Sequence, residues 1–344
     1  MKNQADAIRE FLLTSVQAHP TDLVAKAMQT FSVTRTTVAR HIEYLCQQGK
    51  LIKTGHTRQI RYSLADAAEQ TFIFPLDSRF DEFAVYDKYV RPILDQVAIA
   101  NVESILSYVV TEMLNNCKDH ARAKNVTIYI KVNTSQRLVI DIVDDGIGVF
   151  NTVQQALALT DAREAIFELS KGKVTSDPQN HSGEGIFFSS RACDYFSIEA
   201  NGFCFIRDNT ENDWSLHQTE RKKGSRVTCE LALNSQRDLA EIFKTYQGGE
   251  DNLQFCKTDI TVALADLYGE RLISRSQAQR VTRNLENFSS VLLDFKGIRN
   301  VGQGFVDQVF RVFPQQHGNM QIHYCHANED VTFMIERTLA SLNT

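Results

Sequence analysis

The sequence lacks three patterns that would each identify a whole class of protein. Its seven cysteines are odd in number and never form a CxxC pair, which argues against a disulfide framework and against a zinc site. No apolar run approaches the length of a membrane span, and the polar start MKNQADAIRE does not fit a signal peptide. Neither a repeat nor a low-complexity tract is present. These absences predict a cytoplasmic protein with reduced thiols and no membrane partner.

The composition predicts several soluble domains with different charges. A chain of 344 residues exceeds one ordinary domain, so we expect two or three. Residues 1–65 hold nine Lys/Arg against four Asp/Glu, a net charge of +5, while the whole chain carries −5. A basic segment joined to an acidic body predicts a nucleic-acid module at the N-terminus.

The N-terminal segment has the order of elements typical of a DNA-binding module. Helical periodicity covers about 6–18, 20–30 and 34–48, and KLIKTGHTRQIRYSL then alternates like a short hairpin. Residues 1–66 resemble a winged helix-turn-helix, in which Val33, Val38, Ile42 and Leu45 face inward. The resemblance implies a recognition helix in the major groove and a wing on phosphate or minor groove, unless the module only contacts protein. The predicted DNA-contacting residues are Arg35, Thr36, Thr37, Arg40, His41, Lys53, His56 and Arg58.

The middle of the chain predicts an α+β sandwich behind a connector. Residues 67–100 mix aromatics, proline and charges and read as the connector. A long helical pattern follows at about 101–123. Strand patterns then occur at NVTIYIKVN, RLVIDIVDD, FSIEANGFCFIRD and RVTCELAL, with a polar stretch at 150–182 between the second and third.

A first candidate site motif lies on the predicted helix. In TEMLNNCKDHA, Glu112, Asn116, Asp119 and His120 share one helix face. A carboxylate and a carboxamide one turn apart can hold hydrated Mg²⁺ and activate a hydroxyl or water. The same pattern also fits a charged solvent face.

A second motif, VDDGIGV, ends a predicted strand. The Asp144 carboxylate can accept a hydrogen bond from the exocyclic amine of a purine, and Gly146 and Gly148 let the backbone approach a ring. Taken alone, the motif also fits a plain loop or a calcium-like turn.

A third motif, HSGEGIFFSSR, places glycines 183 and 185 around Glu184 where a helix can begin. The unpaired N–H groups and the dipole of a helix start favour a phosphate. Alone, this pattern also fits an ordinary turn or cap.

Together and in this order, the three motifs resemble the GHKL superfamily of ATP-binding proteins, whose domain is a Bergerat-type α/β sandwich. The match covers 101–235 and is nearest to the anti-sigma-factor serine kinases. The resemblance implies ATP and Mg²⁺ as cofactors, Glu112 as general base, Asn116 as metal ligand, Asp144 on adenine N6, and 150–182 as a lid. Further implied nucleotide contacts are Asp119, His120, Gly146, Gly148, Lys171, Lys173, Thr175, Gly183, Glu184, Gly185, Ile186 and Thr228, and both Ser225 and Thr228 stand where the family has a supporting serine or threonine.

The C-terminal segment alternates strand and helix patterns from about residue 254. Residues 250–344 resemble the STAS-like domain of unknown function that is often found beside such ATPases, which implies a partner protein. In STAS partners of anti-sigma kinases, a phosphorylated serine follows the strand whose aspartate matches Asp294. Here Gly302 and Gln303 stand in its place, which puts self-phosphorylation in doubt.

Three functions follow from this multidomain α+β organisation. The first is an ATP-switched DNA-binding regulator, acting as a homodimer and slowly hydrolysing Mg-ATP. The second is a serine/threonine protein kinase of the anti-sigma-factor type, and the third is a nucleotide-binding scaffold without turnover. By the resemblance, Glu112 favours hydrolysis or serine phosphorylation, because histidine kinases usually carry asparagine there. The basic N-terminus and the missing phosphoacceptor favour the first.

Overall fold

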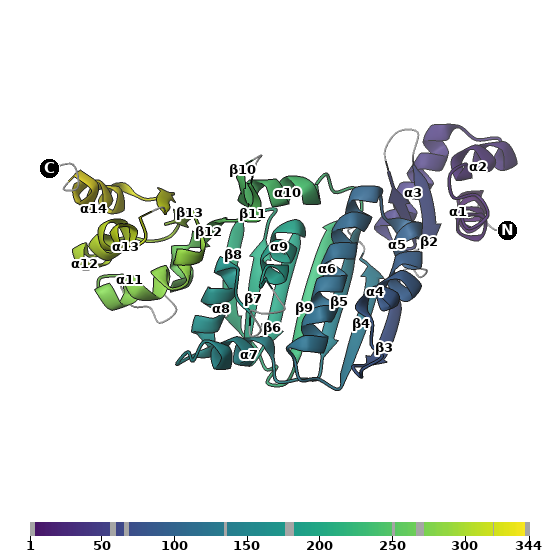
Figure 1. The fold of residues 1–344 in the computed structure, drawn as a ribbon. Coiled ribbons are helices and arrows are strands. Elements are labelled where there is room, and N and C mark those ends of the chain that lie inside the picture. Colours follow the sequence, from purple (N-terminus) through teal and green to yellow (C-terminus); the bar gives the residue numbers. More distant parts are fainter. Residues whose placement is uncertain are drawn as a thin grey trace. The chain divides into compact units, whose positions relative to one another are not determined.

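The computed structural model describes residues 4–55, 60–64, 69–133, 136–175, 182–249, 252–265, 272–318 and 320–340 (Figure 1). These residues form two compact units. The first unit is Met1–Val149 with Ser189–Leu239, and the second is Phe150–Phe188 with Ala240–Thr344. The segment predicted to be the lid therefore groups with the C-terminal residues. Among the described residues, no helix combines the length and apolar character needed to cross a bilayer.

The first unit begins with three helices and a two-stranded antiparallel hairpin around a small apolar core. The third helix starts where the Thr34 hydroxyl accepts a hydrogen bond from the Thr37 N–H. Val38, Ile42 and Leu45 are buried, as the sequence predicts. The elements are α1 Gln4–Ser15, α2 Leu23–Phe31, α3 Arg35–Gln47, β1 Leu51–Thr54 and β2 Arg61–Leu64.

An antiparallel sheet of seven strands, ordered β3-β4-β5-β9-β6-β7-β8, forms the centre of the first unit. The predicted connector is part of this sheet, because β3 pairs with β4 along its whole length. Its remaining residues form short helical segments. The strands are β3 Gln70–Pro75, β4 Asn125–Val132, β5 Arg137–Asp144, β6 Tyr195–Ala200, β7 Phe203–Asp208, β8 Asp213–Gln218 and β9 Ser225–Ala232; the helical segments are α4 Glu82–Val85, η3 Tyr86–Val90 and α5 Arg91–Val97.

The long helix α6, Ala100–Asp119, covers one face of this sheet (Figure 1). Its buried residues recur every three or four positions, so one apolar stripe faces the sheet and packs on β5 and β9. In β5 every second side chain points to the face that α6 covers, and Ile140, Ile142 and Asp144 lie on this face. This alternation positions Asp144 under the C-terminal half of the helix.

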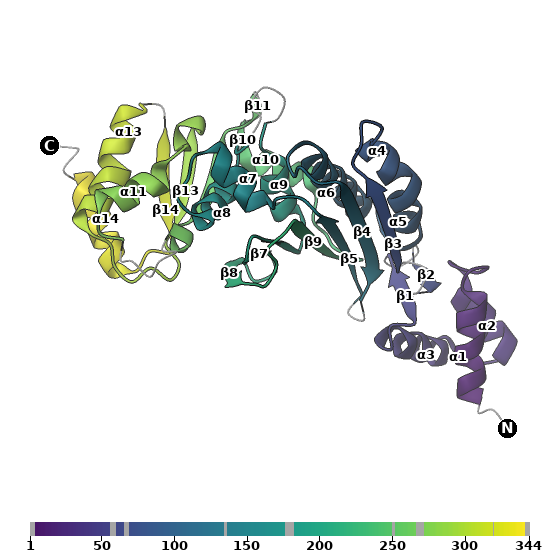
Figure 2. The same cartoon turned by 90° about the horizontal axis from the view of Figure 1, so that it is seen from below.

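The second unit is built around a parallel sheet ordered β12-β13-β14. Figure 2 shows α11 and α14 beside β13 and β14. The predicted alternation of strands and helices is confirmed in this part of the chain. The elements are α7 Val149–Ala156, α8 Ala162–Lys171, α9 Gly185–Ala192 (which continues into the first unit), α10 Leu239–Tyr246, β10 Gln247–Gly249, β11 Asn252–Phe255, β12 Lys257–Thr261, η4 Val262–Ala265, α11 Arg275–Thr282, η5 Leu285–Asn287, β13 Ser290–Asp294, α12 Gln303–Asp307, η6 Gln308–Val312, α13 Phe313–Gln316, β14 Gln321–Cys325 and α14 Glu329–Ala340.

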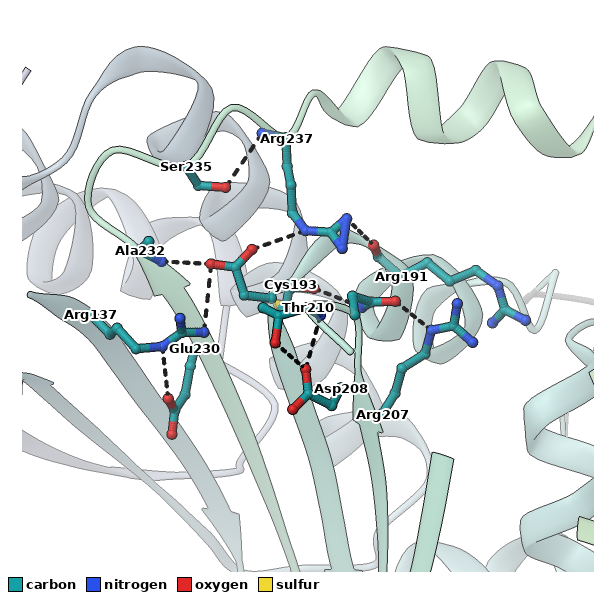
Figure 3. Close-up of polar contacts among 12 residues, drawn as sticks. Arg137, Arg191, Cys193, Arg207, Asp208, Thr210, Glu230, Ala232, Ser235 and Arg237 are labelled. Carbon is teal, nitrogen blue, oxygen red and sulfur yellow. Dashed lines mark hydrogen bonds and ion pairs between the residues drawn. The ribbon is translucent and has the colours of Figure 1, made fainter. Parts of the chain in front are cut away.

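The carboxylate of Asp194, which directly precedes β6, contacts residues of β5, of β9 and of the segment that follows β9; Figure 3 labels its partners Arg137, Ala232 and Arg237. Its Oδ2 accepts from the Ala232 N–H at 2.8 Å and pairs with the Arg137 guanidinium at 3.5 Å. Its Oδ1 accepts from the Arg237 Nε at 3.0 Å. Arg137 also pairs with Glu230 on β9 at 3.2 Å. The network links the first residue of β5, the strand that ends at Asp144, to β9 and to the start of β6.

We expect Asp194→Ala to lower the free energy of unfolding of the first unit by about 2–3 kcal/mol. Breaking a buried pair costs roughly 3–5 kcal/mol, and the lower figure applies because Arg137 and Arg237 remain 24% and 25% exposed. Trp214 is the chain's single tryptophan and lies on β8, so its fluorescence in urea reports on this unit. Asp194→Asn is the control and should lose less. Equal stability of Asp194→Ala and the unmodified protein would contradict the prediction.

Candidate nucleotide site

The first motif lies on the last turns of α6. Glu112 and Asn116 are half-buried one turn apart, Asp119 is exposed, and His120 ends the helix with its N–H on the Asn116 carbonyl oxygen at 3.1 Å. The predicted helix face is therefore present. The Asn116 amide nitrogen contacts the Met113 sulfur at 3.9 Å, so its oxygen is the atom that can accept or bind a cation.

The second motif places a buried carboxylate at the end of β5. Asp144 is 5% exposed. Its Oδ1 accepts from the Gly146 N–H at 2.8 Å and its Oδ2 from the Ser225 N–H at 3.1 Å. Burial raises the pKa of Asp144, and these hydrogen bonds partly oppose that rise. A carboxylate offers about four lone-pair positions, so Asp144 has acceptor capacity left for a further donor.

The structure brings these two motifs together. The Ile147 N–H donates to the Ala121 carbonyl oxygen at 3.0 Å, just beyond the end of α6. A Cβ on Gly146 would lie 2.0 Å from that oxygen, so only glycine fits. The charge of Asp144 also contributes, after burial, to raising the pKa of the Cys117 thiol on α6. The carboxylate of the second motif therefore lies beside the helix that carries Glu112 and Asn116.

The third motif begins α9 and belongs to the second unit. Gly183 has a φ of 71°, and a Cβ there would lie 2.5 Å from the Val174 nitrogen. The glycine is therefore needed for the loop to fold back on residue 174. Burial raises the pKa of Glu184, and the nearby Lys173 charge opposes this. Gly185 and Ile186 form the first turn of α9 and are partly exposed, so their N–H groups lie at a helix start.

The prediction that Lys171 contacts phosphate is wrong in this arrangement. Its side chain is 0% exposed, and its Nζ donates to Glu168 Oε1 at 2.8 Å and to the carbonyl oxygens of Arg280 and Arg283 at 3.0 and 2.9 Å. Three oxygens thus occupy the three N–H donors of the ammonium. Burial lowers its pKa, which Glu168 opposes. Lys171 closes the C-terminal end of α11, where a cation is favoured.

Lys173 makes a similar contact with the C-terminal residues. Its Nζ donates to the Asn287 carbonyl oxygen at 2.8 Å and lies over the rings of Phe255 and Phe288 at 5.4 and 4.9 Å. Thr175, also predicted as a phosphate contact, is half-buried at the end of a described stretch. The segment between the second and third motifs is therefore held by the C-terminal part of its own unit.

Thr228 also differs from the prediction. Thr228 lies on β9 opposite Asp141 of β5, and its hydroxyl donates to Asp141 Oδ1 at 2.5 Å. Ser225 contacts Asp144, and Thr228 is three positions further along the strand. An odd separation places a side chain on the other face of the sheet. Ser225 is the residue that supports the buried carboxylate, through its N–H to Asp144 and through its Oγ, which accepts from the Val149 N–H at 3.0 Å.

In the N-terminal module the structure corrects one predicted DNA contact. His41 is only 9% exposed and faces the core, and burial, then the charges of Arg9 and Arg40, lower its pKa. It follows the exposed Arg40 by one position and lies on the buried face of α3, which packs against α1. Arg35, Thr36, Arg40 and Lys53 are exposed, Thr37 is half-buried at the helix cap, and His56 and Arg58 lie outside the described residues.

Comparison with known proteins identifies the families of two domains of the chain. Residues 101–235 match the family described as histidine kinase-, DNA gyrase B-, and HSP90-like ATPase, and residues 277–332 match the STAS-like domain of unknown function. No curated protein matches the chain. A solved structure, "Crystal structure of ShkA full-length in complex with AMPPNP", aligns over 98% of this chain and 70% of its own at 11% identity. Its TM-score of 0.26 is too low to support any argument. The chain is a mixed α/β multidomain protein with an ATPase domain of the histidine kinase, gyrase B and HSP90 family followed by a STAS-like domain.

Proposed function

We propose that this protein is an ATP-switched DNA-binding regulator whose ATPase domain binds Mg-ATP. The observation that carries the nucleotide part is the buried Asp144 carboxylate beside α6, held by two backbone N–H groups with acceptor capacity remaining. That geometry suits the exocyclic amine of adenine. Asn116 would hold Mg²⁺ through its carboxamide oxygen, and Glu112 would take the proton of the attacking water or hydroxyl. Bound Mg²⁺ would neutralise phosphate charge.

The DNA part of the proposal is supported by exposed cations on two neighbouring elements. Arg35, Thr36 and Arg40 lie exposed on the N-terminal half of α3, and Lys53 lies exposed on β1 of the hairpin. The hairpin is also attached to the ATPase domain. The Lys53 N–H donates to Gln136 Oε1 at 3.0 Å, and the Gly55 N–H donates to Asn234 Oδ1 at 2.9 Å. These two hydrogen bonds connect the ATPase domain directly to the module that would contact DNA.

We expect the full-length protein to bind duplex DNA with an affinity that falls steeply as salt increases. Lys/Arg contacts to phosphate release counterions, which produces the salt dependence. Arg40→Ala should weaken binding by about 1–3 kcal/mol if the side chain reads a base. Fluorescence anisotropy with a labelled genomic fragment at several salt concentrations measures both effects.

Arg79→Ala is the matched control, because Arg79 is exposed on the surface of the first unit and pairs only locally with Asp77 at 2.8 Å. Its affinity for DNA should equal that of the unmodified protein. Salt-independent binding, or equal losses in the Arg40 and Arg79 variants, would count against DNA recognition by α3.

A homodimer would place two copies of α3 on two half-sites and raise avidity by roughly 10²–10⁴ without a new contact.

A second function, a serine/threonine protein kinase, is favoured specifically by Glu112, a carboxylate that can deprotonate a hydroxyl. Incubation with γ-labelled ATP separates the two. Free labelled phosphate supports the regulator, and label on a partner protein supports the kinase.

A further inference from the structure

We propose a zinc site at the carboxyl ends of the parallel strands β13 and β14, formed by Asp294, Cys325 and His326. This inference is independent of the proposed function. The three residues each offer one ligand atom, and these atoms all lie within 4.8 Å of one another. A thiol, an imidazole and a carboxylate together are the donor set that zinc prefers, whereas magnesium and calcium take oxygen ligands only.

The strands themselves build this cluster. Asp294 is the last residue of β13 and is in register with Cys325, the last residue of β14. The Phe295 N–H donates to the Cys325 carbonyl oxygen at 3.0 Å and fixes the two strand ends side by side. Because strand ends that are neighbours in a parallel sheet emerge at the same edge, their side chains are held together by the fold. Ligand-binding residues are common at this edge of parallel sheets.

His326 completes the cluster through an unusual backbone conformation. Its φ of 50° is in the left-handed region, which is uncommon for residues other than glycine. Its Nδ1 lies 3.0 Å from Asp294 Oδ1. Its side chain is 56% exposed, so solvent reaches the cluster and water can take the fourth position of a tetrahedral zinc.

A backbone hydrogen bond from outside the cluster orients one of its three residues. The Lys296 N–H donates to Asp294 Oδ1 at 2.8 Å and orients that carboxylate, as outer hydrogen bonds do at metal sites. A divalent cation would offset the negative charge of the Asp294 carboxylate at this edge of the sheet. The absence of CxxC pairs does not exclude such a site, because its ligands come from two strands.

The test measures zinc retained by the full chain. Protein stripped with a chelator under reducing conditions is given Zn²⁺, dialysed and assayed for metal, and Co²⁺ is titrated as a spectroscopic probe of thiolate coordination. We expect one zinc per chain and a sulfur-to-cobalt absorption band. Cys325→Ser and His326→Gly should weaken binding by roughly 10- to 100-fold or more, which is the range already seen when outer partners of ligands are removed. The glycine variant suits the local φ, so the domain should keep its fold.

Two control variants distinguish this cluster from the other thiols and imidazoles. Cys256→Ser and His323→Ala change the same residue types in the same domain, outside the cluster, and should retain zinc fully. No retained zinc in the unmodified protein would overturn the proposal. So would equal zinc content in the Cys325 variant, or loss of zinc in the control variants to the same extent.

Discussion

Asp144→Ala should abolish measurable ATP binding by the full-length protein, whereas Glu112→Ala should retain binding and lose turnover. The first result is expected because Asp144 is the buried acceptor to which we assign the exocyclic amine of adenine. A hydrogen bond to a charged group contributes about 1.5–3 kcal/mol on its own. The alanine variant also leaves the Gly146 and Ser225 N–H groups without their carboxylate. Equilibrium binding of a fluorescent ATP analogue with Mg²⁺ measures the loss.

The second result separates binding from chemistry. Glu112 lies half-buried on α6, and the proposal gives it a role in proton transfer and none in binding adenine. A general base contributes typically 10²–10⁴-fold to a rate, so turnover should fall by about that factor while the dissociation constant changes little. Phosphate release under saturating ATP, or label transfer to a partner protein, measures the rate.

Asp213→Ala is the matched control for both variants, because Asp213 is an exposed carboxylate on the edge strand β8 of the same unit. It should bind and turn over ATP like the unmodified protein. Unchanged ATP affinity in the Asp144 variant would remove the adenine assignment. Equal losses of affinity in the Glu112 and Asp144 variants would show that Glu112 acts in binding.

Much of the fold could be predicted from local periodicity, and the failures have a common physical cause. The helix α6 has one buried apolar stripe, and the strands β5, β6 and β9 each have one face that is buried throughout, so their apolar patterns are clear. The edge strands β3 and β8 have no fully buried position, so their alternation is weak. An edge strand pairs on one side only, and its sequence carries less of the signal.

In the candidate site, too, the features that are local in sequence could be predicted and those that depend on distant residues could not. The three motifs are local in sequence, and the order of all three, rather than any one of them alone, points to residues such as Asp144 and Gly146. The role of Lys171 could not be predicted, because two of its three oxygen partners are backbone carbonyl oxygens 109 and 112 residues away. No side-chain pattern identifies a carbonyl at the end of a distant helix. The assignment of Thr228 failed for a simpler reason, since strand parity already places it on the opposite face from Ser225.

The second large effect is expected at Lys171. Lys171→Met should lower the free energy of unfolding of the second unit by about 3–5 kcal/mol, the range for removing one partner of a buried ion pair. The substitution leaves Glu168, 1% exposed, without its cation, and leaves the carbonyl oxygens of Arg280 and Arg283 without a donor. Hydrogen exchange at the amides of α8 and α11 measures the loss, while Trp214 fluorescence reports that the first unit is unchanged.

Two further variants show whether the unpaired charge of Glu168 causes the loss of stability in Lys171→Met. In Lys171→Met/Glu168→Leu both buried charges are gone, so much of the lost stability should return, because apolar replacement of a whole buried pair is often neutral. Lys173→Met is the matched single control. Lys173 is half-buried and makes one bond to the Asn287 carbonyl oxygen, so its loss should be about 1 kcal/mol.

The same variants decide between two roles for the segment that joins the Asp144 motif to the Gly183 motif. If Lys171 holds this segment to α11, its substitution loosens α8 and α11 together and alters ATP affinity only through that loosening. ATP binding should then change hydrogen exchange in the STAS-like domain of the unmodified protein, and this response should disappear in Lys171→Met. If Lys171 contacts phosphate instead, Lys171→Met keeps full protection of α8 and α11 and loses ATP affinity directly. The second outcome would restore the role predicted from the sequence and remove the mechanical link between the nucleotide and the C-terminal domain.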